Sequence, residues 1–191
     1  MCPMPNRILI ALAGALLLVG CALSPQVISV QPVLDTAALP RNGAATTLSL
    51  TVNDVRANTI VGYRGGVYDT ATITLGDEST ARIHSELAKA LAARGFSVAS
   101  AGTAATVNLQ VELAELGYQV TQGQVTRTIE VTATLRARSQ AGEVTRTGEY
   151  RDTRTQEFVK PPSDGENGAL INEVLSAAMQ RLVADGELFS Y

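Results

Sequence analysis

Two runs of alternating apolar and polar residues, at 106–118 and 125–138, and a more polar run at 143–158 constrain the fold more than any other feature of this 191-residue chain. Such alternation is typical of β-strands that have one buried face. The turn residues Gly123 and 140–142 separate the runs, which predicts a three-stranded antiparallel meander. The third run is the most polar and is expected near a sheet edge. The first two runs predict these inward-facing side chains: Val107, Leu109, Val111, Leu113, Val125, Ile129, Val131, Ala133 and Leu135.

Two other segments, 77–94 and 164–185, have the spacing of helices with one apolar face. Asp77 or Ser79 is expected to cap the first helix, and Gly95 is expected to end it. Further strands are expected at 27–30, 46–55, 70–75 and 96–99, whereas 56–69 is interpreted as irregular. The order of elements predicts an α+β fold, a two-layer sandwich in which two helices cover one face of an antiparallel sheet.

The first 20 residues have the organisation of a secretory signal. Arg7 is their only charged residue, and the apolar run 8–19 is too short to span a bilayer. It ends in Leu18-Val19-Gly20-Cys21, the pattern of the bacterial lipobox, in which a peptidase cleaves before a lipidated cysteine. The sequence therefore predicts a signal peptide at 1–20, a lipidated tether at 21–26 and one periplasmic domain at 27–191.

Cysteine content agrees with this interpretation. Cys2 would leave with the signal peptide, so Cys21 would be the only cysteine of the mature chain and no internal disulfide could form. Attachment to a membrane is expected through lipid on Cys21. The next residue is Ala22 and not aspartate, which by analogy with lipoprotein sorting in enteric bacteria favours the outer membrane. A net charge of −3 without a basic patch makes nucleic-acid binding unexpected.

The loop that contains Tyr63, Arg64, Gly65, Gly66 and Tyr68 is the candidate partner-binding loop of the chain. Tyrosine and arginine are residue types favoured at interface hot spots. Two other interpretations remain open. The glycines can supply the positive φ of a tight turn, or the glycines and the arginine can form an anion-binding nest.

Catalytic and metal chemistry are not expected. His84 is the only histidine, so a metal site would lack further nitrogen ligands, and no cofactor motif is present. No serine or cysteine has an evident partner base. Asp54 and Arg56 are interpreted as a structural ion pair, and the chain is not expected to be an enzyme.

Several short motifs occur in an order that resembles one known family. They are Val52-Asn53-Asp54-Val55-Arg56, the run 60–68, Ala92-Ala93-Arg94-Gly95-Phe96-Ser97-Val98, Val107-Asn108-Leu109-Gln110-Val111 and Gln122-Gly123-Gln124-Val125. Together with the closing helix, they resemble the YajG-type uncharacterised lipoproteins over nearly the whole mature chain. The resemblance implies a lipoprotein of the Gram-negative envelope, in the outer membrane and facing the periplasm. It implies no established activity and no catalytic residues.

These observations lead to two expectations of function. The first is a non-enzymatic binding or structural component that contacts another envelope protein. The alternative is an accessory subunit of an envelope lipid or solute transport system, which is an analogy at the level of fold. An apolar groove long enough for an acyl chain would favour the transport interpretation, and a flat polar surface would favour protein binding.

Overall fold

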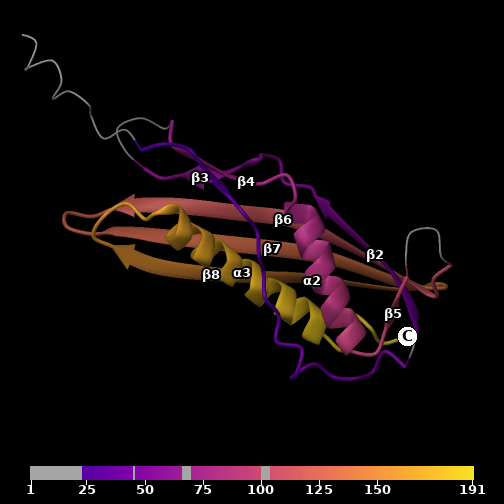
Figure 1. The fold of residues 1–191 in the computed structure, drawn as a ribbon. Helices are drawn as coiled ribbons and strands as arrows, with labels where there is room; N and C mark the ends of the chain where they lie inside the picture. The colour runs from indigo at the N-terminus through magenta and orange to yellow at the C-terminus, as the bar shows by residue number, and fades with distance from the viewer. Residues whose placement is uncertain (1–22, 45, 66–69, 100–103) are drawn as a thin grey trace, which may run out of the picture.

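The computed structural model describes residues 23–44, 46–65, 70–99 and 104–191 (Figure 1). Cys21 and the predicted signal peptide lie outside these ranges. The described elements are β1 (Gln26–Ile28), β2 (Thr47–Asp54), β3 (Ile60–Tyr63), β4 (Thr72–Leu75), α2 (Ser79–Ala93), β5 (Ser97–Val98), β6 (Val107–Gln122), β7 (Arg127–Ala141), β8 (Val144–Phe158) and α3 (Asp164–Ala184).

The strands form one eight-stranded sheet around the long strand β6. On one side β6 pairs with β7, and β7 pairs with β8, in antiparallel ladders that run the length of all three strands. On its other side β6 pairs first with β2 and then, farther along, with β3. β5 extends the sheet beyond β2, and β4 and β1 extend it beyond β3. β8 pairs with β7 alone and is therefore an edge strand, as expected.

The prediction of an antiparallel sheet is wrong, because the observed sheet contains both parallel and antiparallel strand pairs. The β1–β4, β2–β5, β2–β6 and β3–β6 pairs are parallel, whereas β3–β4, β6–β7 and β7–β8 are antiparallel. The physical reason is that parallel partners are joined by long crossovers, such as the connection from β2 to β5 that includes α2. The alternation within a strand does not indicate which distant strand is its partner. The region 56–69 also contains β3, which the sequence interpretation missed.

Both helices cover the same face of the sheet (Figure 1), as expected for the two-layer arrangement. α3 packs on β7 and β8, α2 packs on β2, and the two helices touch each other. The apolar stripe predicted for each helix is buried in the shared core. Val125 is an exception to the predicted core, since it lies beyond the start of β7 and is 77% exposed. In the described part of the chain, no helix is long and apolar enough to cross a membrane.

The ends of α2 are only partly as predicted. Its N-cap residue is Glu78, which makes no side-chain cap, and the Ser79 hydroxyl donates to the Gly76 carbonyl instead. At the other end Gly95 has the expected positive φ of 94°. The Gly95 and Phe96 amides donate to the carbonyls of Ala92 and Leu91, the paired hydrogen bonds of a Schellman motif.

Arg94, beside this turn, is fully buried and joins the ends of both helices. Its guanidinium donates to the carbonyls of Val183 and Asp185 at the end of α3, and to Asn42 Oδ1. It also lies 4.4 Å from the centre of the Phe189 ring. Burial lowers the pKa of Arg94, and the nearby Asp185 carboxylate opposes that effect.

An extended segment, 29–35, runs along α3 and is fixed to it by side chains of the helix. Two residues of extended chain span about 6.6 Å and four helical residues about 6 Å, so alternate backbone amides meet every fourth side chain of α3. The contacts run from the Gln31 amide to Asn172 Oδ1 (2.6 Å), from the Val33 amide to Ser176 Oγ (2.9 Å) and from the Asp35 amide to Gln180 Oε1 (2.9 Å).

Gly62 should tolerate no side chain. A Cβ atom there would lie 2.1 Å from the Tyr118 carbonyl oxygen of β6, where neither backbone can yield. We expect Gly62→Ala to lower the free energy of unfolding by about 2 kcal/mol or more. Gly165→Ala is the control, because that glycine lies in α3 with no atom within 4 Å of a new Cβ. The control should leave stability unchanged or raise it by up to about 1 kcal/mol. Equal urea midpoints for the two variants would contradict the close approach of β3 to β6.

Candidate functional site

The sheet face opposite the helices is open and polar, and it contains a shallow depression of the surface. Alternation along β6, β7 and β8 directs every second side chain to this face. The ladders bring these side chains into rows across the three strands. Successive rows are Gln110–Arg138–Thr147, Glu112–Arg136–Glu149 and Glu115–Thr134–Arg151.

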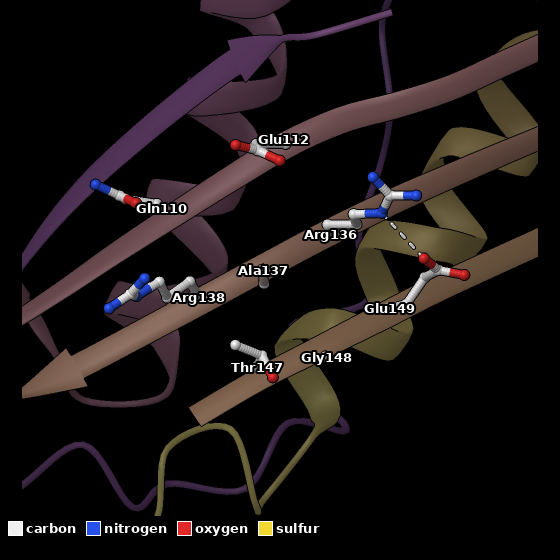
Figure 2. Close-up of a pocket in the computed structure, with 8 residues that line it drawn as sticks. All are labelled: Gln110, Glu112, Arg136, Ala137, Arg138, Thr147, Gly148 and Glu149. Atoms are coloured by element: carbon white, nitrogen blue, oxygen red, sulfur yellow. Dashed lines mark hydrogen bonds and ion pairs between the residues drawn. The ribbon is translucent and has the colours of Figure 1, made fainter. Parts of the chain in front are cut away.

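The first two of these rows line a shallow groove of about 500 Å³ (Figure 2). Arg136 Nε donates to Glu149 across the β7–β8 pair at 3.0 Å. Within the described ranges, neither Arg138 nor Glu112 makes an ion pair or a side-chain hydrogen bond. The groove thus contains one satisfied ion pair together with a guanidinium and a carboxylate that face solvent.

The charges of this groove balance, since two arginines stand against two glutamates. A balanced polar surface suits a partner with complementary hydrogen-bonding groups more than a polyanion, which would need a continuous positive surface. None of the side chains that line the groove is a serine, cysteine or histidine. The arrangement can therefore recognise polar groups.

The other notable charged cluster lies on the helix side of the sheet. Asp152 is 4% exposed and forms ion pairs with Arg181 at 2.7 Å and with Arg154 at 3.3 Å. Arg154 also pairs with Glu173 of α3 at 3.3 Å. Because each charge is paired and the cluster joins β8 to α3, its evident role is structural.

The predicted partner-binding loop is only partly described, since Gly66 and Tyr68 lie outside the described residues. Tyr63 is exposed, but Arg64 is 8% exposed, and its guanidinium faces the protein. Arg64 Nη1 donates to the Ser24 carbonyl and Nη2 to the Pro162 carbonyl, both at 2.9 Å. The expectation that Arg64 offers hydrogen bonds to a partner is therefore wrong for this conformation, because the guanidinium is used inside the molecule. Gly65 has φ of 77°, which agrees with the turn interpretation.

A buried hydrogen-bond chain lies close to Arg64. The Tyr118 hydroxyl donates to Asn167 Oδ1 at 2.8 Å, and Asn167 Nδ2 donates to Gln26 Oε1 at 2.7 Å. Burial raises the pKa of Tyr118 to about 12, although the positive charges of Arg64 and Arg127 oppose this effect. The phenol therefore stays protonated near neutral pH and keeps donating. This chain fixes β1, and with it the start of the described segment, to β6 and α3.

The other residues that the sequence analysis considered as possible site residues have structural roles or lie apart from any site. His84 is half-buried on α2, and no group of three potential metal ligands occurs in the described ranges. Arg56 makes the expected ion pair with Asp54, at 2.7 Å. Burial alone would raise the pKa of Asp54, but hydrogen bonds from Arg56 and its charge leave that pKa lowered overall.

The sequence interpretation missed the groove, although the inward residues that it predicts imply that Gln110, Glu112 and Arg136 face outward. Alternation indicates which face each residue occupies. The grouping depends on cross-strand register, which places Arg136 between Glu112 and Glu149. The two hairpin turns were the signal that could have found it, because turn length fixes register.

The role of Arg64 predicts a loss of stability when its charge is removed. Arg64→Met should lower the free energy of unfolding by about 2 kcal/mol, because the buried carbonyl of Pro162 and the part-buried carbonyl of Ser24 lose a charged donor. Arg138→Met makes the same chemical change on the open face and should cost under about 0.5 kcal/mol. Thermal or urea unfolding of both variants measures the difference. Similar values for the two would mean that the Arg64 contacts contribute little.

Comparison with known proteins agrees with this geometry. The model of a family of uncharacterised lipoproteins matches residues 34–191. The chain is similar to the solved XCC0632 protein of Xanthomonas campestris, at 14% identity over 86% of this chain and 93% of that one, with a TM-score of 0.50. It also matches the hypothetical protein CT253 of Chlamydia trachomatis, at 12% identity over 78% of this chain and 100% of that one, with a TM-score of 0.44. No curated protein sequence matches it.

The likeness to XCC0632 shows a shared fold and no shared activity. The family match is more informative, because it covers all of β2 to α3, including the open face and the groove. It agrees with the resemblance carried by the motifs around Asn53, Gly62 and Gly95. The chain belongs to the YajG-type family of uncharacterised lipoproteins.

Proposed function

We propose that this chain is a lipid-anchored lipoprotein of the Gram-negative envelope that binds another envelope protein through its open sheet face and catalyses no reaction. Lipid on Cys21 would hold it at the outer membrane, facing the periplasm. Family membership supports an envelope lipoprotein. The lipobox at 18–21 and the alanine that follows it support the anchor and its location.

The observation that carries the binding proposal is the polar groove on the uncovered face. Two helices bury one side of the sheet and leave the other to solvent, with Arg138 and Glu112 without a partner among the described side chains. A surface of this kind is well suited to a partner that supplies complementary charges at the rim of an interface.

The alternative, an accessory subunit of a lipid or solute transport system, has less support from this surface. An acyl chain needs a continuous apolar lining, whereas four of the eight residues that line the groove are charged. A transport role would therefore act through contact with another subunit and not through carriage of lipid in this groove.

The anchor is tested by Cys21→Ala in a chain exported on a cleavable signal peptide that has no lipobox, so that the apolar run 8–19 is not retained. We expect the variant to leave the membrane fraction and to keep the melting temperature of the mature domain, because Cys21 precedes every described element. Density-gradient separation of inner and outer membranes, with the unaltered chain as control, locates the protein. A variant that still pellets with membranes after a salt wash would refute the lipid as main attachment.

The binding face is tested by photo-crosslinking in cells. A photoreactive residue in place of Thr147, in the groove, should form a discrete adduct with an envelope protein, and Arg138→Glu should abolish that adduct without changing stability. Lys89 is the matched control position, because its side chain is 68% exposed on α2, on the opposite side of the sheet. An equal adduct from position 89, or one that survives Arg138→Glu, would contradict recognition through the groove.

A further inference from the structure

One end of the sheet gathers the start of the described chain and two exposed valines. Arg64 ties Ser24 to Pro162. Pro162 follows the end of β8, where Phe158 pairs with Arg127 at the start of β7. The β6–β7 hairpin and the end of β8 therefore lie at the end of the molecule where the described chain begins (Figure 1).

The two valines project from this end with no core to cover them. Val125, in the β6–β7 hairpin, is 77% exposed, and Val159, directly after β8, is 78% exposed. Lys160 follows Val159, and Glu157 precedes it by two residues. The end therefore combines apolar side chains with charges of both signs and has no strongly acidic or basic surface.

The distance from this end to the proposed lipid is short. Ser24 lies three positions after Cys21, and this stretch of chain can span at most about 11 Å. Because the Ser24 carbonyl is fixed by Arg64, the tether cannot lengthen by releasing Ser24 unless those contacts break. A lipid on Cys21 inserted in a bilayer would hold Arg64 and its neighbours within about two headgroup layers of the surface.

The opposite end of the same strands differs in character. The β7–β8 hairpin carries Gly142 and Glu143, both exposed, and Val144 is only 39% exposed. β7 has 15 residues, so the two ends of the sheet lie about 45 Å apart. Tyr191, which contacts Ser139 near this hairpin, is 49% exposed. The apolar side chains at the end close to the tether are therefore more exposed than those described at the far end.

We propose that the end formed by Val125 and Val159 docks on the bilayer surface, with both side chains inserted at the interface between headgroups and acyl chains. This inference rests on the proposed lipidation of Cys21. The occupant is a lipid surface, because the tether brings this end to the bilayer and the exposed side chains are apolar. Because this end carries charges of both signs, its affinity for the bilayer should not depend on anionic lipid.

Docking in this way would set the height of the binding groove. Arg138 lies eleven residues along β7 from Arg127, about 37 Å of extended strand. With the strands upright, the groove stands that far from the bilayer, where it can meet a partner in the periplasmic space and not one embedded in the same membrane.

Quenching of a fluorescent label by spin-labelled lipid tests the docking. The acylated protein is placed in phosphatidylcholine vesicles as single-cysteine variants Val125→Cys and Val159→Cys, each labelled with bimane. Labelling is specific because Cys21, the only other cysteine of the mature chain, would be acylated. Spin-labelled lipid should quench both labels at least twofold, and addition of phosphatidylglycerol should not change the result.

The control variants are Val33→Cys, at a valine that is 76% exposed beside α3, and Val144→Cys, at the far end of β8. Neither label should be quenched. Co-flotation with vesicles is measured for every variant, and a melting curve confirms that each is folded. Proteins that do not float refute the lipid anchor and the docking with it. Proteins that float while labels at 125 and 159 are quenched no more than those at 33 and 144 overturn the docking alone.

Discussion

The pairing of β6 with β7, and of β7 with β8, is the constraint on which the rest of the structure depends. β7 is hydrogen-bonded along its whole length on both edges, which leaves its register no freedom. The second edge of β6 is then divided between β2 and β3, so each end of the molecule has its own set of short strands. The helices pack on the apolar face that this register creates. The same register also arranges the side chains of the uncovered face into rows, and it places Gln110 opposite Arg138 and Glu112 opposite Arg136.

Local sequence patterns predicted the elements well where the physics is local. The 3.6-residue stripes of α2 and α3, the alternation of β2, β6 and β7, and the positive φ of Gly95 depend on near neighbours, and the structure confirms them. The sheet pattern was wrong because a parallel partner is chosen across a crossover. β3 was missed because its four residues, Ile60–Tyr63, are too short for alternation to be read, and they contain Gly62 at a shifted register.

The candidate site shows the same difference between local contacts, which the sequence pattern predicts, and distant contacts, which it does not. Residue type alone does not predict the exposure of a side chain, as Arg64 shows. An arginine between glycines in a polar loop has the composition of a contact residue, yet two carbonyls from distant segments, 40 and 98 residues away, enclose its guanidinium. Val125 is the converse case, since it continues the phase of the inward residues of β7 but lies past the end of that strand. In both cases the decisive contacts come from segments far away in the chain.

The docking of segment 29–35 on α3 has a consequence for the order of folding. Its amides at 31, 33 and 35 find their acceptors at 172, 176 and 180, so these contacts cannot form until the last helix has been made. The residues that emerge first are therefore among the last to be fixed. Between 141 and 145 residues of chain separate these partners, so the domain closes over its own N-terminal segment only at a late step of folding.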